Sequence, residues 1–232
     1  MTGIANLELF TFIIFGGTGD LAIRKLIPAL YNLYIENSLN VPFSVIGISR
    51  KQMSHEQYAE FFIDGIQKYS RNKYEEDVYK KMGKSFFYIS GDLQNPETYQ
   101  QLKNILDKAE GSIKNRLFYL ATIPAFFPLV IESLIRHNIL HKGATNPWHR
   151  VIIEKPFGSD LASARKLNQQ LEQLIDDYQM YRIDHYLGKE AVQNFIVMRF
   201  ANGIFEPLWN NKHIDHIQIT VSETMGVGNR GK

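Results

Sequence analysis

The chain has 232 residues, of which 44% are hydrophobic, and a formal net charge of +2 at neutral pH. This length supports one sizeable core and the beginning of another. A charge so near balance, with acids and bases interspersed, argues against a nucleic-acid partner. The absence of cysteine excludes disulfides and thiolate metal sites, and the scattered histidines lack metal-ligand spacing, so no metal is expected. Because the chain has neither a long apolar run nor a signal-peptide pattern, no membrane span is expected, and the cytoplasm is the expected location.

A glycine-rich turn near the N-terminus lies between an apolar run and a helix-like stretch. The run from Leu9 to Phe15 precedes the turn Gly16-Gly17-Thr18-Gly19-Asp20-Leu21-Ala22. In this turn Gly17, Gly19 and Ala22 have the G-x-G-x-x-G/A spacing, in which small residues let the backbone approach a pyrophosphate. Apolar residues then recur at helical spacing: Leu26, Ile27, Leu30, Leu33 and Tyr34. Strand, turn and helix together predict a dinucleotide-binding fold.

The second predicted strand, Phe43 to Ser49, ends at Arg50 and Lys51. Proteins that bind NAD usually have an acidic residue near this point, which accepts a hydrogen bond from the adenosine ribose. A guanidinium group suits a 2′-phosphate instead, so Arg50 predicts a preference for NADP. The alternative is an ordinary exposed arginine.

Further strand candidates follow along the chain. They are short and apolar: residues 86–90, 117–121, 151–153 and 178–183. Because helical or polar stretches separate them, the pattern predicts an α/β fold with a doubly wound, Rossmann-type parallel sheet. The polar segment 71–84 is expected to be a solvated helix and loop.

Two of these strands are followed by residues that can contact a cofactor. Asp92 and Leu93 follow one strand, and Ala121 and Thr122 end the other. The carboxyl edge of a parallel sheet is where such folds hold their ligands. The alternative is that both segments only form turns.

Residues Glu154-Lys155-Pro156-Phe157-Gly158 follow the strand at 151–153. They place a carboxylate and an ammonium group at the same carboxyl edge, before a proline that can adopt a cis bond. Lys155 is therefore expected to face the cleft, and a surface Glu-Lys pair is the alternative.

The segment from Arg182 to Glu190 reads RIDHYLGKE. Lys189 lies where the next helix begins, a position that the helix dipole disfavours for a cation unless an anion binds beside it. This placement suggests a phosphate-bearing ligand. Asp184 precedes His185 and can orient an imidazole for acid–base chemistry. A solvated charged turn is the alternative.

Four segments in chain order carry a resemblance to a known family. They read GGTGDLAIRKL, EKPFG, RIDHYLGKE and RFANGIFEPLWNN. Together they resemble glucose-6-phosphate dehydrogenase, and the resemblance extends from about Phe10 to Gly231. It implies oxidation of glucose 6-phosphate at C1 to the lactone, the first oxidative step of the pentose phosphate pathway, with the hydride passing to NADP.

The resemblance also implies roles for individual residues. The pyrophosphate would be held by Gly16, Gly17, Thr18, Gly19, Asp20, Leu21 and Ala22, and the 2′-phosphate by Arg50. Lys155 resembles a lysine that contacts both sugar and nicotinamide, and Lys25 would point toward the nicotinamide end. The sugar-phosphate ligands would be His185, Tyr186 and Lys189.

Two carboxylates complete the set that the resemblance implies. Asp184 resembles the partner of the catalytic base, and Glu223 matches an acid that binds a sugar hydroxyl. The sequence gives Glu223 independent support, because Ile217, Ile219 and Val221 alternate and Glu223 continues their face. A carboxylate in that register needs a partner.

The end of the chain departs from the family pattern. Family members continue into a GGYYD-like stretch and a histidine base, and none of the seven histidines here occupies that position. The isolated chain is therefore expected to be nearly inactive. The expected domains are an NADP-binding domain at 1–187 and the beginning of a second, α+β substrate and dimerisation domain at 188–232, with a helix at 191–199 and a strand at 214–223. A dimer is expected only for the full-length family member. A smaller departure is Ile123, where the family often has proline.

Two other interpretations stay open. The chain can be another Rossmann sugar oxidoreductase with an EKP segment, of the glucose-fructose oxidoreductase type, although DHYLGKE argues against it. It can also be a binding fragment for NADP or sugar phosphate without catalytic activity, which the missing base favours.

Overall fold

The computed structural model describes residues 8–39, 41, 43–110 and 114–220. The chain divides into two compact units, Met1–Ile183 and Asp184–Lys232. No helix within the described ranges is long and apolar enough to cross a membrane.

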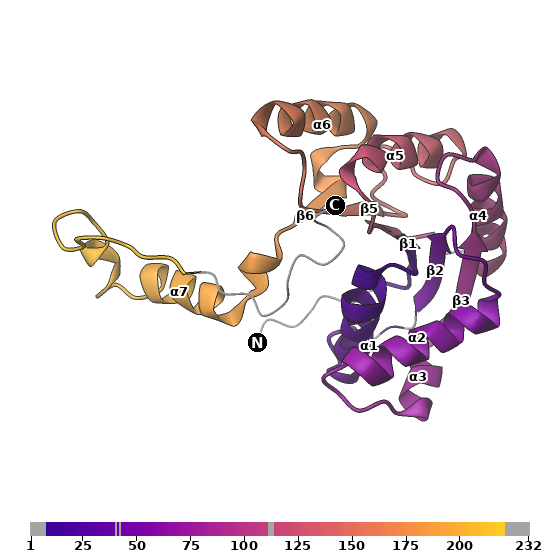
Figure 1. The fold of residues 1–232 in the computed structure, drawn as a ribbon, viewed down its shortest axis with the longest axis horizontal. Helices are drawn as coiled ribbons and strands as arrows, with labels where there is room; N and C mark the ends of the chain where they lie inside the picture. The colour runs from indigo at the N-terminus through magenta and orange to yellow at the C-terminus, as the bar shows by residue number, and fades with distance from the viewer. Residues whose placement is uncertain (1–7, 40, 42, 111–113, 221–232) are drawn as a thin grey trace. The chain divides into compact units, whose positions relative to one another are not determined.

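The first unit is built around a six-stranded parallel sheet with the order β3-β2-β1-β4-β5-β6 (Figure 1). The strands are β1 Thr11–Phe15, β2 Phe43–Ser49, β3 Gly83–Ser90, β4 Arg116–Leu120, β5 His149–Glu154 and β6 Met180–Ile183. From β1 the chain first adds β2 and β3 on one side, and then crosses to add β4, β5 and β6 on the other. This is the predicted doubly wound fold, and its switch point lies between β1 and β4.

Helices cover both faces of the sheet (Figure 1). One core contains residues of the helices α1 Ile27–Ile35, α2 His55–Tyr69 and α3 Glu76–Met82. The other contains residues of α4 Pro96–Ala109, α5 Phe127–Arg136 and α6 Leu161–Leu174. Because side chains alternate along a strand, Phe12 and Ile14 of β1 join the first core while Ile13 and Phe15 join the second. Each such side chain stabilises the fold by roughly 1.5–3 kcal/mol, which explains why every residue of β1 after Thr11 is apolar.

The helix that follows the glycine turn begins with a wider turn. Residues Ala22–Leu26 form a π-helical segment, η1, in which the N–H of Ile27 bonds to the carbonyl of Ala22. Pro28 follows in the first turn of α1 and has no N–H to donate. In regular α-helix its ring would clash with the carbonyl four residues earlier, so the wider turn accommodates the proline.

Most predicted strands are confirmed, with shifted ends. The strand predicted at 178–183 begins only at Met180, because Asp177–Gln179 form a 3-10 turn, η3. The helix predicted within the segment 71–84 is confirmed as α3, but it is not wholly solvated, because its Tyr79 and Met82 are buried in the core. The charged residues around these two gave no sign of their burial.

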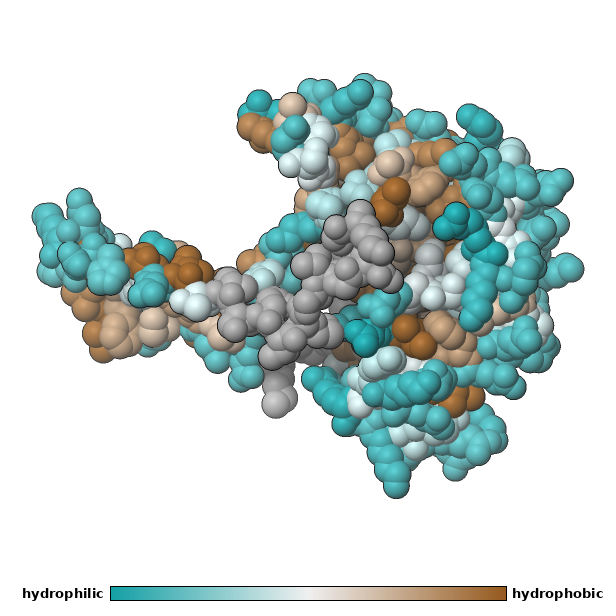
Figure 2. Space-filling view, viewed as in Figure 1, coloured by the Kyte–Doolittle hydropathy of each residue, from teal (hydrophilic) through white to brown (hydrophobic). Residues whose placement is uncertain are grey.

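The second unit contains the short helix η4 His185–Gly188, then α7 Glu190–Phe200 and η5 Glu206–Leu208. None of its described residues, 184–220, is buried, and apolar side chains are exposed along α7, as the brown surface in Figure 2 shows. These include Phe195, Ile196, Val197 and Phe200. Helix α7 confirms the helix predicted at 191–199.

The strand predicted at 214–223 is not formed over its described part. Residues 214–220 have no regular structure, and Ile217 and Ile219 are 65% and 83% exposed. A strand needs a neighbour to pair its backbone, and the described residues of this unit contain no other strand. The remainder of this prediction, including Val221 and Glu223, lies outside the described residues.

Candidate nucleotide site

The glycine turn follows β1 and lies against the ends of its two neighbouring strands, β2 and β4. Gly16 has a φ of +86°, and a Cβ there would lie 2.4 Å from the carbonyl oxygen of Ala121. A Cβ on Gly17 would lie 2.8 Å from the Cα of Gly47 in β2. Neither position leaves space for a side chain, so both glycines are needed for the turn to lie this close to β2 and β4.

Backbone hydrogen bonds fix the turn in place. The N–H groups of Gly16 and Gly17 donate to the carbonyl of Ile48 at 2.9 and 3.1 Å. The N–H of Gly19 donates to the carbonyl of Gly16 at 2.9 Å. The helical segment that starts at Ala22 therefore has a fixed N-terminus beside the sheet edge, and this end of a helix favours a bound anion.

A cleft of about 450 Å³ opens at this edge. It combines segments that follow four strands of the sheet. Its lining residues are Gly16, Thr18, Gly19, Ile48, Ser49, Arg50, Lys51, Gly91, Asp92, Leu93, Thr122, Ile123 and Phe126. Seven of the predicted cofactor residues thus lie together: Gly16, Thr18, Gly19, Arg50, Asp92, Leu93 and Thr122.

The other predicted cofactor residues lie around the cleft in different roles. Gly17 and Ala121 form the close backbone contacts behind the turn, and Ala22 is fully buried in the core. Leu21 is half-buried against the same core. Asp20 is paired with Arg24 at 3.2 Å.

Two predicted lysines of the first unit are exposed. Lys25 lies in η1, and Lys155 directly follows β5. The peptide bond between Lys155 and Pro156 is cis, as the sequence suggested. The neighbouring Glu154 accepts a short hydrogen bond from the hydroxyl of Tyr119, whose pKa is raised by burial and by this carboxylate.

The residues of the cleft fit a dinucleotide. The hydroxyl oxygen of Thr122 is buried and has no hydrogen-bond partner among the described residues, although it belongs to a cleft-lining residue. A buried hydroxyl without a partner is costly, and a ligand group in the cleft can supply one. The glycine turn is a second point of agreement, because Gly16, Thr18 and Gly19 line the cleft where a dinucleotide fold holds its pyrophosphate.

Sequence reasoning named Thr18 but missed Ser49 and Tyr88, whose hydroxyl groups connect it to the strands beside the cleft. The hydroxyls of Thr18 and Ser49 are 2.6 Å apart, and that of Ser49 is 2.9 Å from the hydroxyl of Tyr88. The Tyr88 hydroxyl also donates to the carbonyl of Lys51 at 2.6 Å. These contacts span 31 to 39 residues in sequence, so no local motif indicates them.

The second unit brings three of the predicted substrate residues together. The ring of His185 lies 4.9 Å from that of Tyr186, and the ammonium nitrogen of Lys189 lies 4.1 Å from the centre of the Tyr186 ring. Asp184 accepts a hydrogen bond from the N–H of Tyr186 at 3.0 Å. Lys189 is the residue before the first turn of α7, as predicted. The cluster presents a cation, an imidazole and a phenol within one tight turn, a set that can bind a phosphate.

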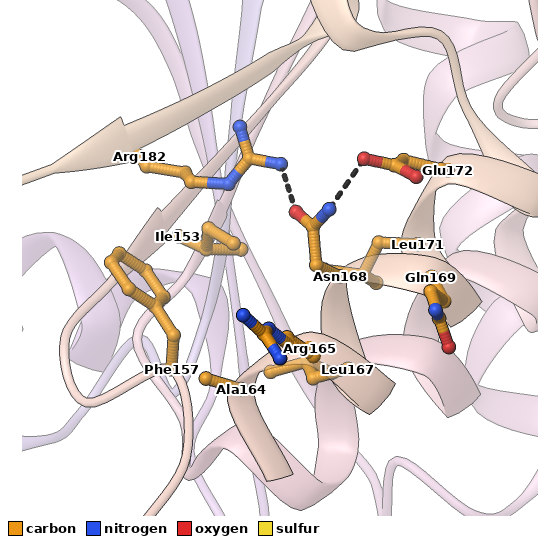
Figure 3. A pocket seen from close by; sticks show the side chains of 10 residues that line it. All are labelled: Ile153, Phe157, Ala164, Arg165, Leu167, Asn168, Gln169, Leu171, Glu172 and Arg182. Atoms are coloured by element: carbon orange, nitrogen blue, oxygen red, sulfur yellow. Dashed lines mark hydrogen bonds between the residues drawn. The ribbon is translucent and has the colours of Figure 1, made fainter. Parts of the chain in front are cut away.

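A larger cavity of about 540 Å³ lies between α6 and the strands β5 and β6 (Figure 3). Three of its polar groups bond to one another: Asn168 accepts from Arg182 at 2.5 Å and donates to Glu172. The rest of its lining combines apolar side chains such as Phe157 and Leu167 with the polar Arg165 and Gln169. No predicted cofactor residue lines it, so the smaller cleft is the candidate nucleotide site. Among the residues that the structure describes, no group of three or more His, Asp or Glu side chains is arranged to hold a metal ion.

Comparisons with known proteins agree with this geometry. The model of the glucose-6-phosphate dehydrogenase NAD binding domain matches residues 13–194, and that of the C-terminal domain of the same enzyme matches residues 196–232. Glucose-6-phosphate 1-dehydrogenase of Chlamydia muridarum is 45% identical over 225 residues, which are 94% of this chain and 44% of the relative. The Rhizobium meliloti enzyme is 42% identical over 228 residues, which are 98% of this chain and 45% of that relative.

A solved structure of a relative is similar as well. A glucose-6-phosphate dehydrogenase in complex with its substrate glucose-6-phosphate superposes with a TM-score of 0.73 and is 34% identical, covering 88% of this chain and 42% of that one. The chain thus spans less than half the length of these relatives. It belongs to the glucose-6-phosphate dehydrogenase family.

Proposed function

We propose that the chain serves NADP-dependent oxidation of glucose 6-phosphate at C1 to the lactone. The observation that carries this proposal is the cleft at the switch point, where Gly16 approaches Ala121 and the Thr122 hydroxyl lacks a partner among the described residues. The names of the relatives and the substrate in the solved complex support the reaction. NADP would accept the hydride from C1.

The preference for NADP rests on the residues at the end of β2. Arg50 and Lys51 line the cleft there, and Ser49 precedes them. None of the three offers a carboxylate to a ribose 2′-hydroxyl, whereas a guanidinium group can bind a 2′-phosphate with two hydrogen bonds. We therefore assign Arg50 to the 2′-phosphate, and the glycine turn with Asp92, Leu93 and Thr122 to the rest of the nucleotide.

The sugar phosphate is assigned to the segment between β6 and α7. Lys189 and His185 lie beside Tyr186, so the segment concentrates hydrogen-bond donors for an anion. Lys155 and Glu223 are assigned to the sugar, and Lys25 to the nicotinamide end, by resemblance to the family. Binding energy from the phosphate, remote from the reacting carbon, would align C1 with the hydride acceptor.

Asp184 is assigned to positioning a base that removes the C1 hydroxyl proton. The chain has seven histidines, and by resemblance to the family we assign none of them to the position of that base. We infer that residues 1–232 bind both ligands and turn over at a near-zero rate. We also propose that residues 1–187 form the NADP-binding domain and that residues 188–232 form the beginning of the second domain.

A binding and turnover experiment tests this proposal. Calorimetry should detect glucose 6-phosphate but not glucose, and Lys189→Ala should weaken binding roughly tenfold or more, because a charge-assisted hydrogen bond is lost. Lys212→Ala, an exposed lysine of the same unit, is the matched control. Asp184→Asn should leave binding unchanged. Equal binding of glucose and glucose 6-phosphate would contradict the substrate assignment, and robust turnover by this chain would contradict the account of the base.

A further inference from the structure

Three hydroxyl groups connect the glycine turn to the end of β2. Thr18 belongs to the turn, Ser49 ends β2, and Tyr88 lies on the neighbouring strand β3. Their oxygen atoms form a continuous chain, with separations of 2.6 and 2.9 Å. The chain ends at the carbonyl oxygen of Lys51, 2.6 Å from the Tyr88 hydroxyl.

The direction of these hydrogen bonds follows from the number of protons. A phenol has one proton, and Tyr88 donates it to the carbonyl of Lys51. Ser49 must therefore donate to Tyr88, and Thr18 must donate to Ser49. The Lys51 carbonyl is the nearer acceptor of the phenol proton, and the Ser49 carbonyl lies at 3.4 Å. Removal of the whole Tyr88 hydroxyl therefore frees the Lys51 carbonyl and leaves the Ser49 hydroxyl without its acceptor.

Tyr88 is itself held rigidly. Its side chain is 4% exposed, and its ring centre lies 5.0 Å from that of the buried Tyr58 in α2. Its backbone N–H donates to the Nδ1 atom of His55, also in α2, at 3.0 Å. Tyr88 does not line the cleft, so it can act on a ligand only through the residues that it holds.

The residues that it holds include those assigned to the 2′-phosphate. Arg50 lies between Ser49 and Lys51, and the Tyr88 hydroxyl contacts a group on each side of it. We propose that Tyr88 is a positioning residue that fixes the Arg50 segment in its binding conformation and thereby sets the preference for a nucleotide with a 2′-phosphate. The inference rests on the proposed NADP site.

The physical reason is the entropy of ordering. An exposed segment at the end of a strand must give up conformational freedom when Arg50 binds a phosphate, and this loss weakens binding. Tyr88 removes that freedom before the ligand arrives. NAD has no 2′-phosphate, so its binding does not require Arg50 to be fixed.

The test is calorimetric titration of the whole chain with NADP and NAD, using Tyr88→Phe, which removes one oxygen atom. The dissociation constant for NADP should rise about three- to tenfold, the effect of one net hydrogen bond, while that for NAD stays unchanged. The selectivity ratio should fall by the same factor. A merely structural role would weaken the binding of both nucleotides and leave this ratio constant.

Tyr31→Phe is the matched control. The Tyr31 hydroxyl is also bonded to two backbone groups, the carbonyl of Lys73 and the N–H of Glu75, but it does not line the cleft. This variant should retain the wild-type ratio. Should Tyr88→Phe fail to fold, as judged by circular dichroism, Ser49→Ala breaks the same chain of hydroxyls and should lower the ratio too.

The outcomes separate the inference from the function on which it rests. A wild-type chain that prefers NADP, together with an unchanged ratio in Tyr88→Phe, or in Ser49→Ala where that variant replaces it, overturns the inference alone. A wild-type chain that binds neither nucleotide, or binds both equally, overturns the proposed NADP site and the inference with it. A fall in the ratio in Tyr88→Phe but not in Tyr31→Phe supports both.

Discussion

The carboxylate of Glu154 accepts a hydrogen bond from the buried hydroxyl of Tyr119, which joins the end of β5 to the neighbouring strand β4. Tyr119 is 3% exposed, and Glu154 is half-buried. This contact fixes the strand end from which Lys155 leaves the sheet.

Removal of this hydroxyl should destabilise the first unit. Tyr119→Phe leaves a half-buried carboxylate without its tyrosine partner, so the free energy of unfolding should fall by about 1.5–3 kcal/mol. Glu154→Gln in the same background should recover part of the loss, because the unpaired group then carries no charge. Urea unfolding of the single and double variants measures the coupling, and additive effects would show that the two residues do not interact.

Nucleotide binding should be sensitive to the glycine turn. Gly16→Ala combines a φ of +86° with a Cβ only 2.4 Å from the Ala121 carbonyl oxygen, so the turn must move away from β4. Affinity for both NADP and NAD should fall by roughly tenfold or more, since the backbone donors to the pyrophosphate shift. Gly203→Ala meets no atom within 4 Å and serves as the control in fluorescence titrations. Unchanged affinity in Gly16→Ala would place the nucleotide elsewhere.

A buried ion pair at the amino-terminal end of β4 should contribute strongly to the free energy of unfolding. Arg116 and Glu110 are 2.6 Å apart, and their side chains are only 6% and 1% exposed. Arg116→Ala leaves a buried carboxylate unpaired and should cost about 3–5 kcal/mol. Arg71→Ala breaks an exposed pair with Glu36 and should cost only about 0–1 kcal/mol. Chemical denaturation compares the two, and similar losses would contradict this account.

Acid should destabilise the fold through His149. Burial, and then the charges of Arg116 and His141, lower its pKa from 6.5 to about 4. Below pH 6.5 the His149 imidazole becomes protonated in the unfolded chain, whereas in the folded chain it stays neutral until about pH 4. Stability should therefore be full above pH 6.5 and fall by about 1.4 kcal/mol per pH unit between these values, on account of this group alone.

His149→Gln tests the pH dependence. Glutamine can still accept the hydrogen bond that the His141 N–H gives to the imidazole, but it does not titrate. The slope of stability against pH between 6.5 and 4 should become shallower by the amount attributed to His149. An identical slope in both proteins would assign the acid sensitivity to other groups.

Local patterns in the sequence predicted the sheet and most of the nucleotide cleft. The apolar run of β1 is followed directly by the glycine turn with Gly17, Gly19 and Ala22. One continuous segment of the sequence therefore predicts the strand, the turn and the helix. The parallel, doubly wound sheet then followed from the alternation of strands with helical stretches, because parallel strands need crossover connections. This is why Asp92 and Thr122 could be assigned to one edge.

Long-range contacts could not be predicted in the same way. The hydroxyl chain from Thr18 to Tyr88 depends on the register between β2 and β3, which no motif encodes. Tyr79 lies in a charged segment, and only the packing of α3 shows that it is buried. The strand predicted at 214–223 is not formed over its described part, residues 214–220. Alternation indicates a face that a strand can bury, but it does not indicate whether a neighbouring strand is there to pair with it.

Titration of the chain with NADP and NAD, with and without Arg50→Ala, tests the central claim most directly. The account predicts tighter binding of NADP than of NAD, and a loss of roughly tenfold or more in NADP affinity in the variant, with NAD affinity unchanged. Arg71→Ala, which alters an arginine outside the cleft, should behave as the wild type. Equal affinities for the two nucleotides, or full NADP affinity in Arg50→Ala, would contradict the account.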